Sequence, residues 1–363
     1  MAKVKILIDS QNFWDHLAQD IKSAKKNIYL QTLSFEGDQT GQSLLKVLTD
    51  TKADDIKIIS DQYIKYVIND KFIYSLKNLL DEKLQDEVKA TKKLINSFKD
   101  NNIKVKILDP PGIPLIKIIN CNHKKIVQID DQISYIGGIN FCEHNFLWHD
   151  MMLRIEDPAI SYFFQTDFLK TWNGEDLDLS QTFENIEIKL TNGNNNKKYF
   201  QRVIDLIASA KKSIFIESPY LTFPFYKPLR EAKNRGVEIN IITPQNNNKK
   251  IIGEYIKWEA ARSNFNLYHY PEKMTHLKAM LIDNHILITG SSNFDFLSYR
   301  IYKETIIIIK DKKIIDDFKE KVIQPDLNKS KKYNEKPNYL VGWTIYLLLK
   351  ILSKTSYWLV KGL

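Results

Sequence analysis

The sequence predicts an α/β fold made of two duplicated α/β/α sandwich domains. Three observations support this fold: strand-like and helix-like segments alternate, the alternation of the first half returns in the second, and one polar motif occurs in each half with the same spacing. Such alternation is typical of a sheet covered by helices. Because whole segments repeat, we expect two domains related by pseudo-twofold symmetry, followed by a C-terminal amphipathic helix.

The first half sets out the pattern of elements. Phe13, Leu17, Ile21 and Ala24 recur at helical spacing, which predicts a helix with one apolar face. The predicted elements are, in chain order, a strand at 5–8, a helix at 12–26, a strand at 27–35, a helix at 41–49 and a strand at 56–59.

A charged helical insertion follows at 72–98. Its apolar positions are Leu76, Leu79, Leu80, Leu84, Val88 and Leu94. We expect helices that cover the domain and face water, because most such charge runs are solvated; a lid over the site is the alternative.

The second half repeats the first. Ala24–Leu30 returns as Ala210–Ile216, and the helix before it returns at 199–210. A helix at 228–234 and a strand at 236–242 repeat the next pair. We therefore place the domains at 1–178 and 179–330, with the amphipathic helix at 336–363.

Three connecting segments stand out. A helix at 157–174 is expected to join the halves, and 191–196 reads as a polar turn or loop. A second polar loop, 245–248, follows the end of a strand, where loops often carry substrate contacts.

The repeated motif carries the candidate chemistry. In each copy Lys stands two residues after His, Asp seven, Gly fourteen and Asn seventeen. Two matches with identical offsets make chance a poor explanation, although a single short motif is weak. The copies consist of His123, Lys125, Asp130, Gly137 and Asn140, and of His276, Lys278, Asp283, Gly290 and Asn293.

Apolar and polar residues alternate through each motif, so each copy is predicted to be a strand. Side chains two residues apart share a face of a strand, so His and Lys should point the same way. Asp130 and Asp283 lie at odd offsets and should face away, which favours a structural role. The glycines end the next strand and let the backbone approach a ligand, with Asn140 and Asn293 just beyond.

Two copies of the motif together offer two imidazoles, two ammonium groups and two amides. This set suits a phosphodiester, because cationic and amide donors can hold the non-bridging oxygens. One His can then attack phosphorus while the other protonates the leaving oxygen. Each His also needs an acidic partner on its other ring nitrogen to fix its tautomer.

These residues resemble the signature of the phospholipase D superfamily, His-X-Lys-X4-Asp followed by Gly-Ser-X-Asn or Gly-Gly-X-Asn. The likeness is greatest to the bacterial cardiolipin synthase branch and extends over roughly residues 5–310. Further stretches that carry it are Trp148-His149-Asp150 through Arg154-Ile155-Glu156-Asp157-Pro158, Glu217-Ser218-Pro219-Tyr220, and Ser291-Ser292-Asn293-Phe294-Asp295 with Ser298, Arg300 and Glu304. Two departures, His149 in place of Arg and Lys303 in place of Asn, concern the substrate rather than the reaction class.

The resemblance implies roles for individual residues. The motif residues form the catalytic set, with His123 the better candidate for the nucleophile. Asp150 and Glu304 orient His123 and His276, respectively. Asn140, Asn293 and Ser291 bind phosphate. No metal or other cofactor is required, since two Lys and two Asn stabilise the charge.

The resemblance also implies the reaction: transfer of a phosphatidyl group to phosphatidylglycerol through a phosphohistidine. Three hypotheses remain open. The chain is a phosphatidyltransferase or a phospholipase D that hydrolyses phospholipids, a phosphodiesterase acting on nucleic acid, or a non-catalytic membrane scaffold. No obligate protein partner is inferred.

Composition narrows the setting. The net charge of +9, from 53 basic and 44 acidic residues, suits an anionic partner such as a membrane surface or nucleic acid, although biased composition explains it equally well. Cys121 and Cys142 are too few for a disulfide framework or a metal site, which suggests a reducing compartment. The apolar run at the start of the sequence is too short, and charged residues follow it too soon, for a signal peptide.

The C-terminal stretch is rich in Leu and aromatic residues. Its uncharged run ends at Lys350, short of the roughly 18 to 20 apolar residues that a membrane span needs. Lys350, Lys354 and Lys361 fall on one helical face. We expect an in-plane helix at an anionic membrane, hence a peripheral protein of the cytoplasmic face; packing on the protein core is the alternative.

Overall fold

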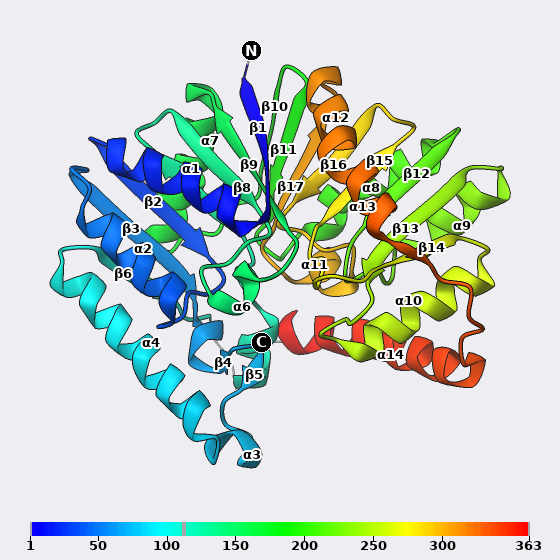
Figure 1. Cartoon of the computed structure of the whole chain (residues 1–363), viewed down its shortest axis with the longest axis horizontal. Helices are drawn as coiled ribbons and strands as arrows, with labels where there is room; N and C mark the ends of the chain where they lie inside the picture. Colours follow the sequence, from blue (N-terminus) through cyan, green and yellow to red (C-terminus); the bar gives the residue numbers. More distant parts are fainter. Residues whose placement is uncertain (1, 111–113, 362–363) are drawn as a thin grey trace. The chain divides into compact units, whose positions relative to one another are not determined.

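The computed structural model describes residues 2–110 and 114–361, apart from the side chains of 114–116 and 356–361. Contacts divide the chain into two compact units, with the division between Leu177 and Asp178. Each unit is built around one large sheet (Figure 1).

The sheet of unit 1 has seven strands. Strands β2, β3 and β6 run parallel, while β7, β8, β9 and β1 continue the sheet by antiparallel pairing. The spatial order is β1 (Lys3–Ile8), β9 (Met151–Glu156), β8 (Ile133–Gly137), β7 (Ile126–Ile129), β2 (Asn27–Thr32), β3 (Asp55–Asp61) and β6 (Lys104–Leu108).

Helices cover both faces of this sheet. On one face, apolar side chains of α1 (Asp9–Ser23), α2 (Gln39–Thr49) and α4 (Glu82–Asp100) form a continuous core with the strands. On the other face, Phe168 of α7 (Pro158–Trp172) stacks on Tyr29. The segment expected to join the halves is therefore a covering helix of unit 1.

The sheet of unit 2 repeats this arrangement. The order β9-β8-β7-β2-β3-β6 has its counterpart in β17-β16-β15-β12-β13-β14, with the same parallel and antiparallel pairings. The full order is β10 (Leu179–Phe183), β11 (Ile186–Leu190), β17 (Thr305–Ile309), β16 (Ile286–Gly290), β15 (Ala279–Ile282), β12 (Ser213–Glu217), β13 (Glu238–Pro244), β14 (Asn266–Tyr270) and β18 (Lys331–Lys332). The predicted duplication of the α/β fold is confirmed.

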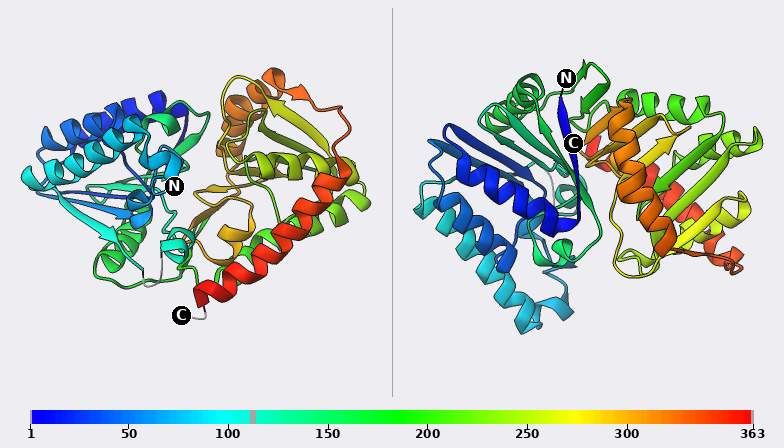
Figure 2. Two further views of the ribbon diagram at one scale, coloured as in Figure 1. Left: turned by 90° about the horizontal axis from the view of Figure 1, so that it is seen from below. Right: turned by 45° about the horizontal axis from the view of Figure 1, so that its top comes forward.

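Helices also cover the sheet of unit 2. On one face, α8 (Asn196–Ser209), α9 (Tyr226–Asn234) and α10 (Lys250–Arg262) bury their apolar side chains in one core with the strands. The segment from α12 (Lys312–Phe318) through the π-helix Lys319–Ile323 to α13 (Gln324–Lys329) lies on the opposite face (Figure 2).

The predicted C-terminal helix is present as α14 (Tyr339–Lys361) and packs within unit 2. Ile345 and Leu349 join the core of that unit, and a Cβ at Gly342 would meet the Trp258 ring of α10. The opposite side of the helix is exposed and apolar, with Leu340 at 73% and Ile351 at 59% exposure. No helix among the described residues is both long and apolar enough to cross a membrane. Lys361 lies outside the described side chains.

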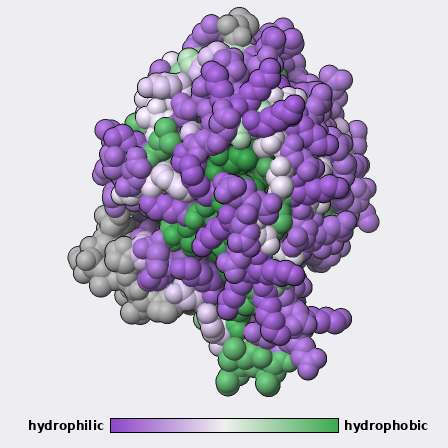
Figure 3. All heavy atoms as spheres, turned by 90° about the vertical axis from the view of Figure 1, so that its left-hand side faces the viewer, coloured by the Kyte–Doolittle hydropathy of each residue, from purple (hydrophilic) through white to green (hydrophobic). Residues whose placement is uncertain are grey.

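The predicted insertion at 72–98 differs from a simple helix pair. A small hairpin of β4 (Val67–Ile68) and β5 (Lys71–Phe72) leads into α3 (Leu76–Leu79), and α4 begins only at Glu82. Leu84, Val88 and Leu94 are buried as their spacing predicts, but Leu76 and Leu80 are 85% and 84% exposed. The α3 segment forms the apolar projection at the bottom of Figure 3.

Candidate active site

The motif of unit 1 lies just before a strand. Residues 123–125 precede β7, so the prediction that His123 and Lys125 are part of the strand is wrong. Both side chains are nevertheless buried, and Lys125 Nζ donates a hydrogen bond to the His123 carbonyl at 2.8 Å. The intervening Lys124 points elsewhere, since its Nζ lies 2.6 Å from Asp167 Oδ1 on α7 in a buried ion pair.

The motif of unit 2 has the same place before β15. His276 and Lys278 are buried, and Lys278 Nζ lies 2.8 Å from His276 Nδ1 and 3.0 Å from Nε2. The two side chains contact each other here, in line with the prediction that they point the same way. A buried ammonium beside an imidazole provides positive charge where an anionic phosphate oxygen can bind.

Asp130 and Asp283 hold turns. Asp130 accepts hydrogen bonds from the backbone N–H of Lys25, Lys26 and Asn27 at 2.8, 2.7 and 3.2 Å. Asp283 accepts the same three bonds in unit 2, from Lys211, Lys212 and Ser213 at 2.9, 2.7 and 3.0 Å. Both residues have a φ of 51°. These contacts favour the structural role over the catalytic one.

The Asp283 carboxylate is stabilised in its charged form. Partial burial raises its pKa, but the backbone donors at Lys212, Lys211 and Ser213 outweigh burial and lower it below its usual range. A carboxylate held in this way does not act as a proton donor near neutral pH.

The glycine–asparagine turn of unit 1 brings Asp150 close to the backbone. A Cβ on Gly138 would lie 2.3 Å from Asp150 Oδ2, so only glycine allows the carboxylate to reach this position. Asp150 is buried and accepts a hydrogen bond from the N–H of Met151. Asn140 is buried as well, with its amide donating to Asn145 Oδ1 at 2.8 Å.

In unit 2 the equivalent turn organises a buried acid. Glu304 is fully buried and accepts hydrogen bonds from Ser291 Oγ at 2.6 Å and Ser298 Oγ at 2.7 Å. Ser291 Oγ also accepts a bond from Thr305 N–H, so its hydroxyl is engaged with the protein. These contacts support Glu304 as a fixed acid and give Ser291 a positioning role. Phosphate binding by Ser291 stays a prediction.

Asn293 differs from Asn140. It is buried, and its side-chain oxygen has no hydrogen-bond partner among the described residues. Buried polar atoms are normally satisfied, and those that are not merit a functional explanation. An amide with free bonding capacity fits a group that binds a ligand.

A family model described as "Cardiolipin synthase, PLD-like domain" matches residues 17–172 and 203–324, which is most of the chain. The chain belongs to this family. Among curated relatives of this phospholipase D-like protein are cardiolipin synthase 1 of Staphylococcus epidermidis, 27% identical over 92% of this chain and 71% of the relative, and a cardiolipin synthase of Staphylococcus aureus, 26% identical over 88% and 66%. The chain thus spans about two thirds of the length of these relatives.

Among solved structures, a phosphatidylserine synthase of Haemophilus influenzae matches this phospholipase D-like chain with a TM-score of 0.68 and 15% identity, over 97% of this chain and 93% of the other. At this identity the match shows the fold alone. Together these matches confirm the predicted family and fold class. They also confirm the enzyme class, a phosphatidyltransferase or phosphodiesterase of the cardiolipin synthase type.

The two departures from the family pattern have different surroundings. His149, where Arg is usual, is buried, and its Nδ1 lies 2.7 Å from Asp9 Oδ1. Asp9 in turn donates its backbone N–H to the Asp150 carbonyl, so this pair holds the segment just before β9 that carries the predicted orienting acid. Lys303 is only partly buried and directly precedes Glu304 in the chain.

The sequence did not predict that Tyr220 and Lys249 pack beside His276. The Tyr220 ring stands edge-on to the His276 imidazole, with the ring centroids 6.0 Å apart, and Lys249 Nζ lies 4.2 Å above the Tyr220 ring. Asn247 of the predicted 245–248 loop is buried and donates to the Pro219 carbonyl at 2.7 Å. The sequence predicts substrate contacts for the 245–248 loop. The position of Tyr220 beside His276 could not be predicted, because it depends on packing between segments that are distant in the chain.

Proposed function

We propose that the chain is a phosphatidyltransferase of the cardiolipin synthase type, which transfers a phosphatidyl group to phosphatidylglycerol. The observation that carries this proposal is the pair of equivalent half-sites, each with a buried His and Lys at the same place before the same strand. Family membership and the names of the curated relatives support the lipid reaction.

The proposed reaction consists of two displacements at one phosphorus. His123 attacks phosphorus, the bond to the donor's glycerol oxygen breaks, and His276 gives that oxygen a proton. His276 then takes the proton of the acceptor's hydroxyl, whose oxygen attacks phosphorus and releases His123. Lys125, Lys278 and the two asparagines stabilise the non-bridging oxygens.

The direct test supplies purified protein with phosphatidylglycerol in mixed micelles. We expect cardiolipin and free glycerol in equal amounts, at least 1000-fold less in His123→Ala and His276→Ala, and an unchanged rate in His16→Ala, which alters a histidine outside both motifs. Release of phosphatidic acid without cardiolipin would identify a hydrolase. Cleavage of single-stranded nucleic acid with no lipid turnover would reject the lipid substrate.

A phosphohistidine should be trapped when the reaction is stopped between the two displacements. Brief reaction of wild type with donor lipid, quenched in base, should leave an acid-labile phosphatidyl adduct on the peptide that contains His123. An adduct on the His276 peptide instead would reverse the two roles, and the absence of any adduct together with the absence of turnover would argue for a non-catalytic scaffold.

We also propose that the protein binds anionic membranes peripherally, at the cytoplasmic face. The exposed apolar side of α14, where Leu340, Trp343 and Ile351 lie, supports this proposal, as does the α3 projection with Leu76 and Leu80. Aromatic and aliphatic side chains of this kind favour the lipid interface, and the net charge of +9 favours anionic lipid.

Vesicle co-sedimentation tests membrane binding. Trp343→Asp, Leu340→Asp and deletion of 338–363 should each weaken binding to phosphatidylglycerol vesicles by tenfold or more. Tyr162→Asp is the matched control, because Tyr162 on α7 is equally open to solvent at 68% exposure. Equal loss in the control, or none in any variant, would contradict α14 as the membrane contact.

A further inference from the structure

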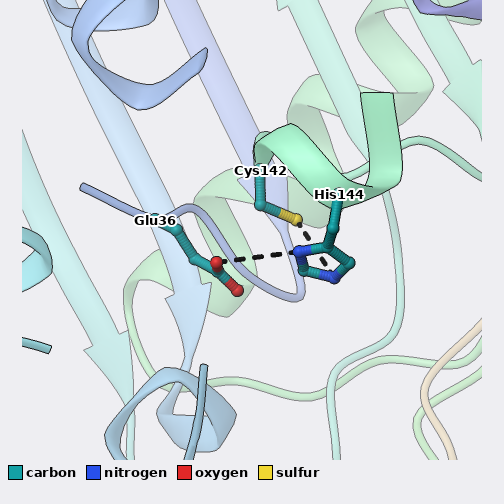
Figure 4. Close-up of side chains that lie close together, drawn as sticks. All are labelled: Glu36, Cys142 and His144. Carbon is teal, nitrogen blue, oxygen red and sulfur yellow. Dashed lines mark hydrogen bonds and ion pairs between the residues drawn. The ribbon is translucent and has the colours of Figure 1, made fainter. Parts of the chain in front are cut away.

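A compact group of metal-binding side chains lies in unit 1, outside the motif. Glu36 follows β2, Cys142 caps α6 (Glu143–Phe146), and His144 lies within that helix (Figure 4). One ligand atom from each residue can be chosen so that all three lie within 4.8 Å of one another. The two ring nitrogens of His144 face different partners: Cys142 Sγ lies 3.9 Å from Nε2, and Glu36 Oε2 lies 3.7 Å from Nδ1.

An ion takes one nitrogen from an imidazole, so the set to compare with a tetrahedral zinc site is the one with a single atom from each residue, all within 4.8 Å. Ligand bonds of about 2.0–2.3 Å at tetrahedral angles place neighbouring donor atoms roughly 3.3–3.8 Å apart. The set is therefore up to about 1 Å more open than a bound site, and side-chain rotations would have to bring the donors together. Thiolate, imidazole and carboxylate are also the three donor types that zinc takes in proteins.

The backbone holds the donors in place. Phe35 and Phe141 pair as an isolated bridge, and Glu36 N–H donates to the Phe141 carbonyl. Glu36 Oε1 accepts the backbone N–H of Asn69 at 3.0 Å, which orients the carboxylate. A rigid ligand set that is hydrogen-bonded from outside is what a metal site requires.

The charges around the group favour a cation. Asp70 Oδ1 lies 3.7 Å from His144 Nε2, and Asp38 and Glu87 add negative charge near Glu36. The side chains of His144 and Asp70 are partly exposed, so an ion can enter from solvent.

The equivalent place in unit 2 provides a natural comparison. The Leu221–Phe294 bridge matches the Phe35–Phe141 bridge, and it aligns Thr222, Asp295 and Leu297 with Glu36, Cys142 and His144. There a plain hydrogen bond, from Phe296 N–H to Thr222 Oγ1 at 3.1 Å, joins the two segments. Only the unit 1 set combines sulfur, nitrogen and oxygen donors.

We propose that Glu36, Cys142 and His144 bind one zinc-class divalent ion, with Asp70 or water as the fourth ligand. The ion would fasten the segment after β2 to the turn that carries Asn140, and so stabilise one half-site without taking part in the reaction. This proposal departs from the expectation that two cysteines are too few for a metal site, because His144 and Glu36 supply nitrogen and oxygen ligands beside the one sulfur. On binding, the Cys142 thiol releases its proton to solvent.

Cobalt titration of the full chain, after treatment with a chelator, tests the site. Wild type should bind one Co²⁺ with a thiolate-to-cobalt charge-transfer band in the near ultraviolet, and Zn²⁺ should displace it. The matched variants are the two cysteine substitutions: Cys121→Ser should keep the band and Cys142→Ser should lose it. Glu36→Gln and His144→Asn should each weaken affinity by tenfold or more.

Thermal unfolding gives an independent readout. Zn²⁺ should raise the Tm of wild type and Cys121→Ser but leave His144→Asn unchanged, since a ligand that binds the native state stabilises it. The proposal is overturned if wild type shows no saturable band, or if the band survives Cys142→Ser. Since the cobalt titration of wild type can overturn the proposal by itself, the test does not depend on the variants being folded.

Discussion

The motif aspartates offer the sharpest test of which motif residues take part in the reaction. Asp283→Ala removes the acceptor of three backbone N–H groups, whereas Asp283→Asn keeps a carbonyl oxygen and tolerates the φ of 51° at this position. If the residue serves the turn, stability should fall in the order wild type, Asn, Ala, and turnover of the folded protein should stay within a few-fold of wild type.

The magnitude follows from the contacts. Each lost bond costs on the order of 1 kcal/mol net, because partial exposure lets water replace the carboxylate. Placing Ala in a left-handed conformation adds about 1 kcal/mol. We expect about 3–4 kcal/mol for Asp283→Ala and about 1 kcal/mol for Asp283→Asn at pH 7. The same series at Asp130, which accepts the same three bonds, should give similar values.

The pH dependence has a definite sign. The backbone donors hold the pKa of Asp283 below its usual range despite partial burial. Its contribution to stability is therefore complete above the unfolded-state pKa and is lost as pH falls through the folded-state pKa. The difference between wild type and Asp283→Asn should narrow in acid.

Urea unfolding measures these differences, and the headgroup-transfer assay at a temperature where every variant is folded measures turnover. An Asp283→Asn variant as stable as wild type but more than 100-fold slower would refute the structural role. It would place the carboxylate in the reaction instead.

Three further predictions concern other parts of the fold. Partial burial raises the pKa of Asp55, but bonds from Lys57, Lys104 and Tyr29 outweigh burial and lower the pKa to about 2. Asp55→Asn should therefore cost about 1–2 kcal/mol in urea unfolding at pH 7, after allowance for screening, and this cost should shrink as pH falls toward 2 and vanish below it. An equal cost at pH 7 and pH 2 would contradict this. Gly138→Ala would place a Cβ 2.3 Å from Asp150 Oδ2. Because this clash would displace the predicted orienting acid of His123, kcat should fall at least tenfold with little change in KM. An unaltered kcat would mean that Asp150 has no orienting role. In Gly342→Val, the new Cβ would lie 2.1 Å from the Trp258 ring. This clash should lower the free energy of unfolding by about 1–3 kcal/mol and make α14 more sensitive to proteolysis. Unchanged cleavage would show that the helix does not depend on this packing.

The assignment of a lipid reaction and the fold rest on different kinds of information. The spacing of His, Lys, Asp, Gly and Asn was sufficient to recognise the family. Identical offsets in the two halves can be read along the chain, and they require no information about how the chain packs. The strand order of both sheets then followed the duplication. The proposed domain limits and the pairing of Asp150 and Glu304 with their histidines stay predictions.

Local periodicity was reliable where one face of an element is buried. Leu84, Val88 and Leu94 of α4 lie in the core as their spacing predicts, whereas Leu76 of α3 and Leu80, just after it, are exposed to water. A helical pattern shows that residues share a face, but it does not show whether another element covers that face. For this reason the insertion, although predicted as helical, was described incompletely.

The sequence by itself determined the duplicated α/β pattern and the repeated His–Lys motif, because these depend on spacing along one chain. Only the tertiary structure decided that Asp130 binds the turn at Lys25, that α14 rests on Trp258, and that Glu36 meets Cys142 and His144. Such contacts join residues that are distant in the chain, and their geometry comes from how strands and helices pack, which no local pattern encodes.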